Sequence, residues 1–195
     1  MIDKALKQPV MTVRTLAKII GTLVACFPAV EYGQLFYREL EFIKIEALKV
    51  KYDYEQNIAL TDQSKEELKW WTTEGINCGR HISHGNADEI IVTDASGHGW
   101  GAVYKGKHTQ GLWTHSEAKK HINVLEMRAG LIGIQSLCND LKNCHLQIQM
   151  DNQTSVTYIN NLGGTHSKLV NQYARELILW CKNRDIWLSA CHIAG

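Results

Sequence analysis

The sequence predicts an α/β protein in which a mixed sheet with flanking helices follows a small helical region. Two observations predict this organisation. Apolar residues recur at helical spacing over most of residues 1–71, whereas short strand and helix patterns follow one another from residue 89 onward. Those patterns come in the order strand, strand, strand, helix, strand, helix, helix, strand. This order predicts a five-stranded mixed sheet with helices packed on it.

The size and composition of the chain exclude some classes of protein. Its 195 residues suffice for one or two domains with a real core. No run of about 18 apolar residues is present, so we expect no membrane-spanning helix and no membrane partner. No signal-peptide pattern is evident, so we expect an intracellular protein, cytoplasmic or nuclear. The formal charge of +1 means that any nucleic-acid-binding face is local. The sequence does not indicate an oligomeric state.

The first part of the chain is predicted to be helical. Thr12 is a candidate N-cap for a helix that ends near Pro28, and a second helical run follows until the polar stretch 51–56. Thr61 or Ser64 is expected to cap a third helix. The polar residues of that helix are expected on its solvent side: Glu66, Glu67 and Lys69.

The second part of the chain has a different pattern. Strands at about 89–95, 99–105 and 108–114 are separated by tight glycine turns, which predicts an antiparallel meander. A helix at 123–138 is apolar on nearly all sides and is expected in the core. The remaining elements are a strand at 146–150, helices at 154–160 and 169–183, and a strand at 186–193.

Residues 73–88 lack periodicity and are predicted to link two domains, with boundaries at 1–85 and 86–195. Cys78, His81 and His84 recur here at a spacing of three. Zinc sites need a second ligand pair at suitable spacing. None is obvious in this sequence, so a polar linker is the preferred interpretation.

One acid interrupts an apolar strand. Asp94 is costly to bury there unless it is paired or bound to a cation. Glu126 lies near the start of the apolar helix, and Asp151 directly follows the strand at 146–150. If that strand pairs beside the first, both aspartates lie at one edge of the sheet, and the helix start can bring Glu126 to them. Clustered carboxylates suit divalent cations such as Mg²⁺ or Mn²⁺.

Each acid also has a purely structural interpretation. Asp94 could begin an Asx-turn. Glu126 could form a capping box with Asn123, three residues before it. Asp151 and Asn152 could cap the helix that follows them. Residue spacing alone leaves these alternatives open.

Several motifs add to this pattern. They are TDAS at 93–96, GWGA at 99–102, HINVLE at 121–126, DN at 151–152, IN at 159–160, GGT at 163–165 and ACHIAG at 190–195. Together they resemble the ribonuclease H domain of retrotransposon reverse transcriptases, nearest in style to DIRS-like and gypsy-like elements. The resemblance covers roughly residues 88–195. A weaker one, to the thumb and connection region that follows the polymerase, rests on TVRTLA at 12–17, FPAV at 27–30 and ELKWW at 67–71.

The resemblance implies a ribonuclease H-like fold and an endonuclease that hydrolyses the RNA strand of RNA/DNA hybrids. It also implies that this chain works with the polymerase part of a retroelement polyprotein. Two Mg²⁺ or Mn²⁺ ions would be used, with Asp94 bridging both and with Glu126 and Asp151 each holding one. Two such ions activate a water and stabilise the leaving oxygen in phosphodiester cleavage.

Polar residues beside the acids are candidates for substrate contacts. Asn123 and Gln153 match family positions that contact the minor groove, where 2′-hydroxyls distinguish RNA from DNA. Ser96 and Asn152 are candidates for phosphate contacts.

The sequence departs from the family pattern in two places. The family has a fourth acidic ligand in a helix after the last strand, introduced by Asn-x-x-Ala-Asp, and this sequence reaches Gly195 before that pattern. We therefore expect the domain to be incomplete at its C-terminus. The cellular enzymes also use a mobile histidine, but His192 does not lie at its position and receives no role.

Two other functions remain open at this point. A catalytically inactive module of the same fold could hold nucleic acid or a partner protein. A nuclease of the same fold could instead act on DNA.

Overall fold

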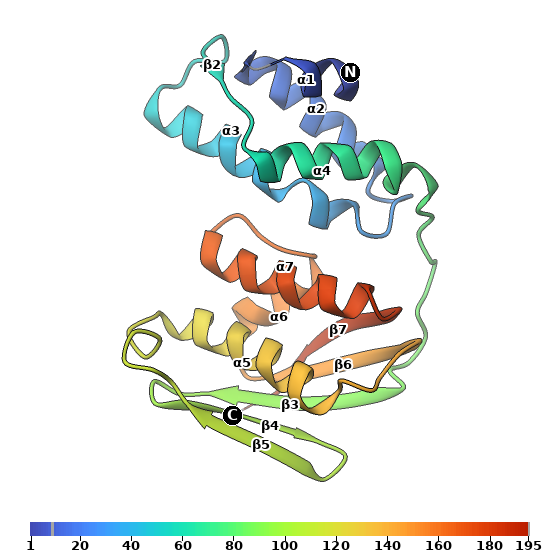
Figure 1. The fold of residues 1–195 in the computed structure, drawn as a ribbon, viewed down its shortest axis with the longest axis vertical. Coiled ribbons are helices and arrows are strands. Elements are labelled where there is room, and N and C mark those ends of the chain that lie inside the picture. Colours follow the sequence, from blue (N-terminus) through green and yellow to red (C-terminus); the bar gives the residue numbers. More distant parts are fainter. Residues whose placement is uncertain (9, 195) are drawn as a thin grey trace. The chain divides into compact units, whose positions relative to one another are not determined.

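The computed structural model describes residues 1–8 and 10–194. The chain forms two compact units, Met1–Ile82 and Ser83–Gly195 (Figure 1). No helix in the described residues is both long and apolar enough to cross a membrane. The assignment of residues 1–85 to a thumb- or connection-like region, and of 86–195 to a ribonuclease H-like domain, stays a prediction.

The first unit is helical, as predicted. Its helices are α1 (Ile2–Lys7), α2 (Val13–Cys26), α3 (Arg38–Val50) and α4 (Asp62–Thr73), with short 3-10 helices η1 (Gly33–Phe36) and η2 (Gly75–Asn77). Two strands that the sequence pattern does not reveal, β1 (Met11–Thr12) and β2 (Asn57–Ile58), pair antiparallel. Each has only two residues, which is too short for an alternating pattern to be visible.

Side-chain caps set the starts of α2 and α4. The Thr12 hydroxyl accepts a hydrogen bond from the Thr15 N–H at 3.2 Å, and the Thr61 hydroxyl accepts one from the Ser64 N–H at 3.1 Å. The prediction of Thr12 as an N-cap is confirmed, and Thr61 rather than Ser64 caps α4. Each cap satisfies an N–H group that has no partner inside its own helix.

The prediction that Glu67 faces solvent is wrong. Its side chain is 0% exposed. Its two carboxylate oxygens accept hydrogen bonds from the Glu39 N–H at 3.2 and 3.1 Å, and one of them also accepts from the Leu40 N–H at 3.4 Å. These are N–H groups of the first turn of α3, which lack partners within that helix. Glu67, on the polar side of α4, therefore caps the N-terminus of α3. Helical periodicity within α4 cannot show this contact with another helix.

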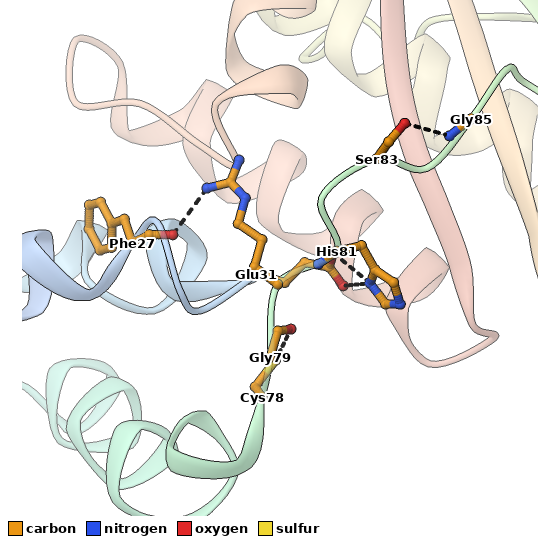
Figure 2. Close-up of polar contacts among 8 residues, drawn as sticks. Phe27, Glu31, Cys78, Gly79, His81, Ser83 and Gly85 are labelled. Atoms are coloured by element: carbon orange, nitrogen blue, oxygen red, sulfur yellow. Dashed lines mark hydrogen bonds and ion pairs between the residues drawn. The ribbon is translucent and has the colours of Figure 1, made fainter.

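Short-range contacts hold the residues on either side of the boundary between the units (Figure 2). In the first unit, Arg80 donates to the Phe27 carbonyl at 3.0 Å, and the His81 ring lies 2.9 Å from a carboxylate oxygen of Glu31. In the second unit, the Gly85 N–H donates to the Ser83 hydroxyl at 3.1 Å.

The second unit contains the predicted α/β elements. They are β3 (Glu89–Ala95), β4 (Gly99–Tyr104), β5 (Lys107–Leu112), α5 (Ile122–Leu137), β6 (Cys144–Met150), α6 (Gln153–Asn160), α7 (Lys168–Lys182) and β7 (Ile186–His192). Each lies within about two residues of its predicted bounds. The predicted class, an α/β protein with a five-stranded mixed sheet and flanking helices, is confirmed.

The sheet has the order β5-β4-β3-β6-β7. Its first three strands along the chain form the expected antiparallel meander, and β6 then runs parallel to β3 and β7 parallel to β6. Helices α5 and α7 pack on one face of the sheet (Figure 1) and share a core with it that includes Ile91, Met127, Ile148 and Leu177, all 0% exposed. Because β3 and β6 are adjacent and parallel, their C-terminal ends lie side by side. The edge at which the acids meet is this edge formed by strand ends, not an outer strand of the sheet.

Helix α5 lies unusually close to the sheet. A methyl group added at Gly133 would lie 2.7 Å from the Cβ of Ala102 on β4. Real Cβ atoms do not approach one another so closely, so the glycine permits this packing. The close packing carries the N-terminal end of α5 to the same edge at which β3 and β6 end.

Candidate metal centre

Three acids from three different elements meet at this edge of the sheet. Asp94 is the penultimate residue of β3, Glu126 lies near the N-terminal end of α5, and Asp151 directly follows β6. A carboxylate oxygen from each lies within 4.8 Å of those of the other two. The parallel pairing of β3 with β6 therefore brings together the three acids that the sequence singled out.

The structure corrects which of the three acids is buried. Asp94 and Asp151 are exposed, whereas Glu126 is only 2% exposed. Along β3 the side chains alternate, so Ile91 and Thr93 face the core and Asp94 faces away from it. The argument that an acid must be compensated for its burial therefore applies to Glu126, not to Asp94.

The carboxylate of Glu126 has only part of the bonding that burial demands. One oxygen accepts a hydrogen bond from the Ala95 N–H at 3.3 Å. The other is buried and has no hydrogen-bond partner among the described residues. Burial, then the negative charges of Asp151 and Asp94, raise the pKa of Glu126 to about 7, although the Ala95 N–H opposes this shift. The protein alone thus leaves this ionised carboxylate destabilised.

A divalent cation suits this donor set. All three ligands are carboxylate oxygens, which Mg²⁺ and Mn²⁺ prefer. The charges found to act on Glu126 are both negative, and no ion pair to a basic side chain is found for the three acids in the described part of the chain. Two of the carboxylates are exposed, so an ion can reach them from solvent. The residues present therefore fit a bound cation.

The structural interpretation of Glu126 as part of a capping box is wrong. His121 is the N-cap of α5, and its ring nitrogen accepts from the Asn123 N–H at 3.2 Å. Asn123 therefore lies inside the helix rather than at its cap. The carboxylate of Glu126 is bonded to Ala95 of β3 instead of to the cap residue.

The cap predicted at Asp151 and Asn152 is confirmed at Asn152, and Ser96 takes the turn role considered for Asp94. The Ser96 hydroxyl accepts from the His98 and Gly99 N–H groups, both at 3.2 Å, and so closes the turn after β3. Asn152 caps α6, since its side-chain oxygen accepts from the Ser155 N–H at 2.9 Å.

The predicted substrate-contacting residues lie in two groups. Asn152 donates to the Asn123 side-chain oxygen at 2.9 Å, and Asn123 donates to the Thr154 hydroxyl at 3.3 Å, which links the first turns of α5 and α6. Gln153 is exposed as the first residue of α6. Ser96 is exposed too, but its hydroxyl serves the turn described above. Their contacts with a substrate stay predictions.

One residue beside the acids had no role assigned from sequence. His192, the last residue of β7, has its Nε2 atom 2.9 Å from the backbone oxygen of Asp151. The register that pairs Met150 with His192 explains this contact. The only sequence feature that could have revealed it is the end of the last strand, once β7 is known to run parallel to β6.

Comparisons with known proteins show similarity at the level of structure. The sequence matches no protein-family model and no curated protein. The RNase H1 of the halophilic archaeon Halobacterium salinarum NRC-1 is 12% identical, over 54% of this chain and 85% of that one, with a TM-score of 0.43. LC11-RNase H1, solved in complex with an RNA/DNA hybrid, is 19% identical over 54% and 84%, with a TM-score of 0.46.

A foamy viral protease-reverse transcriptase, also solved with an RNA/DNA hybrid, aligns with the whole of this chain. The match is 13% identical, covers 100% of this chain and 27% of that one, and has a TM-score of 0.33. Similarity at these levels leaves the function of this chain to be inferred from its own residues.

Proposed function

We propose that this chain is an endonuclease that hydrolyses the RNA strand of RNA/DNA hybrids, with two Mg²⁺ or Mn²⁺ ions held by Asp94, Glu126 and Asp151. We further propose that it works as part of a retroelement reverse transcriptase, beside the polymerase. The carrying observation is the meeting of three carboxylates from separate elements, one with a buried oxygen that no described residue partners. The motifs around these acids, which resemble ribonuclease H, supply the class of reaction.

The three carboxylates have different parts in this proposal. Divalent ions supply an activated water and charge stabilisation for the leaving oxygen of the phosphodiester. Glu126 is fixed by the Ala95 N–H and provides the ligand on the buried side. Asp94 and Asp151 are exposed and provide ligands on the side open to solvent and substrate.

The proposal includes four substrate contacts. Asn123 and Gln153 are assigned to the minor groove, where hydrogen bonds to 2′-hydroxyls select RNA. Ser96 and Asn152 are assigned to backbone phosphates. Each is adjacent in sequence to one of the three acids or lies within three residues of one. This proximity favours their contact with nucleotides next to the scissile bond.

The electrostatics of the cluster make cation binding dependent on pH near neutrality. A pKa of about 7 keeps a large fraction of Glu126 protonated at that pH when no cation is bound. A cation stabilises the ionised form, so its binding is expected to release a proton and to strengthen as pH rises.

Cleavage of a hybrid tests the proposal. The protein, in a form that also carries the fourth acidic ligand of the family pattern, is mixed with an RNA/DNA hybrid, labelled on the RNA strand, in Mg²⁺. Fragments with 5′-phosphate and 3′-hydroxyl ends are expected. Asp94→Asn is expected to reduce the rate by at least about 100-fold, since even partners outside the ligand set commonly contribute 10- to 100-fold. Asp140→Asn is the matched control, because this exposed aspartate follows the opposite end of α5. Equal rates for Asp94→Asn and the parent protein would show the assignment to be wrong.

Substrate comparison separates the rival functions. Faster cleavage of duplex DNA than of the hybrid would identify a DNA nuclease of the same fold. No cleavage of hybrid, duplex or single strand, together with no stabilisation by Mg²⁺, would indicate an inactive module that binds nucleic acid or a partner protein.

A further inference from the structure

The end of β7 lies beside the backbone that carries Asp151. Strand β7 runs parallel to β6 (Figure 1). In this pairing His192 is in register with Met150. One residue further, the Ile193 N–H donates to the Met150 carbonyl at 3.1 Å. The two chain segments therefore stay paired up to the residue before Asp151.

His192 extends this pairing to Asp151 itself. Its Nε2 atom lies 2.9 Å from the Asp151 carbonyl oxygen, an ordinary hydrogen-bond length. A carbonyl oxygen only accepts, so Nε2 must carry the hydrogen, which fixes the tautomer of the neutral ring. On the other side of Asp151, Asn152 caps α6. The backbone around Asp151 is thus held from two directions.

A second side chain fixes β7 at the position from which His192 reaches Asp151. Strand β7 is at the edge of the sheet. Asn160, at the end of α6, donates to the Ala190 carbonyl at 2.9 Å and accepts from the Ala190 N–H at 2.8 Å. The Asn160 side chain thus bonds both backbone polar groups of Ala190, as the backbone of a neighbouring strand would. Because Ala190 is two residues before His192, this contact restrains the end of the strand.

We infer that His192 is a positioning residue for the metal centre. Its Nε2–H group holds the Asp151 backbone so that the carboxylate stays close to those of Asp94 and Glu126. Such a restraint matters because like charges whose oxygens lie within 4.8 Å repel one another, and Asp151 is an exposed residue just beyond the end of a strand. The inference rests on the proposed function, since it assigns His192 to the same site.

Cation-dependent stabilisation provides the first test. The melting temperature of the 195-residue chain is measured across a titration with MnCl₂. His192→Ala is expected to weaken the apparent Mn²⁺ affinity by about 10-fold, the range seen for groups that orient metal ligands. His192→Gln keeps an N–H donor and is expected to retain most of the affinity. His108→Ala removes an exposed histidine from β5 and is expected to match the parent protein.

Two results of this titration would overturn the inference. One is a parent-like affinity in His192→Ala. The other is a loss of Mn²⁺ affinity in His192→Gln as large as that in His192→Ala. If the inference is correct, the N–H donor that glutamine retains preserves the affinity. A merely structural role would lower the melting temperature of the metal-free variants without separating alanine from glutamine in Mn²⁺ affinity.

Heteronuclear NMR of the imidazole nitrogens provides a test that needs no metal and no destabilising variant. The His192 ring, identified by the signal missing from His192→Gln, is expected in the Nε2–H tautomer when neutral. The Nδ1–H tautomer would overturn the inference. If the parent protein shows no stabilisation by Mn²⁺, the proposed function fails, while the NMR result still decides separately whether His192 holds Asp151.

Discussion

Two buried glutamates, one in each unit, show how the surroundings of a carboxylate decide its role. Glu67 on α4 is 0% exposed and Glu126 on α5 is 2% exposed. Both oxygens of Glu67 accept backbone N–H groups from the start of α3. Glu126 has one such bond, and its second oxygen has no partner among the described residues. Burial is thus nearly equal, and the difference lies in the bonding.

The charges around the two glutamates differ as well. Glu67 lies at the N-terminus of α3, where the helix dipole favours an anion. Glu126 lies beside Asp94 and Asp151, whose charges disfavour its ionised form. A buried acid that is fully bonded stabilises a fold, whereas one left short of partners beside other acids has a donor set that suits a cation. Substitution of each glutamate by glutamine, in separate variants, tests this contrast.

The largest expected difference is in catalysis. Glu126→Gln is expected to reduce cleavage of a labelled RNA/DNA hybrid by at least about 100-fold, because it removes a proposed direct ligand. Glu67→Gln is expected to retain cleavage under conditions in which its unit remains folded. Initial rates in Mg²⁺ provide the measurement, with circular dichroism to verify folding. If Glu126→Gln cleaved the hybrid as fast as the parent protein, the proposed contrast between a metal-binding Glu126 and a structural Glu67 would be wrong.

The next largest difference is in the pH dependence of stability without metal. The pKa of Glu126 is raised from 4.5 to about 7, so the folded state binds the proton more tightly than the unfolded state. The favourable contribution of the protonated form is complete below pH 4.5 and is lost as pH rises through 7. Between pH 5 and 8 the free energy of unfolding should fall by about 2 to 3 kcal/mol more in the parent than in Glu126→Gln.

Urea unfolding of the two proteins at the two pH values, in the presence of a chelator, measures this difference. Parallel pH profiles for the parent protein and Glu126→Gln would contradict the raised pKa. Added Mg²⁺ should reverse the loss in the parent alone.

The smallest difference is expected in the free energy of unfolding at pH 8 without metal, which the two substitutions should change in opposite directions. Glu67→Gln is expected to lower the free energy of unfolding by about 2 kcal/mol, because hydrogen bonds to charged groups contribute about 1.5 to 3 kcal/mol. Glu126→Gln is expected to raise the same quantity, because it removes a buried charge that neighbouring acids repel. Urea unfolding measures both changes. Destabilisation by Glu126→Gln as large as that by Glu67→Gln would mean that both acids are structural.

Local sequence patterns were sufficient to predict the elements of the second unit. Alternation and apolar spacing depend on near neighbours, so β3 was predicted at 89–95 and is found at Glu89–Ala95. The order of the elements also predicted a mixed sheet. The meeting of Asp94 and Asp151 followed from one assumption, that β6 pairs beside β3, which the register shows to be correct.

The features that were mispredicted or missed depend on contacts between elements distant in sequence. Helical spacing places Glu67 on the polar side of α4 but does not show that α3 begins against it. An apolar strand does not reveal that Asp94 lies on the exposed face of the sheet. The contact of His192 with Asp151 joins residues 41 positions apart and depends on the register of two parallel strands.

Direct measurement of Mn²⁺ binding tests the central claim, that Glu126 and its two neighbouring acids form a divalent-cation site. Electron paramagnetic resonance of free Mn²⁺, at pH 8, gives the bound fraction in the parent protein, in Glu126→Gln and in Glu67→Gln. We expect the parent protein and Glu67→Gln to bind Mn²⁺ alike and Glu126→Gln to lose at least about 10-fold in affinity. Equal binding by Glu126→Gln and the parent protein would contradict the account.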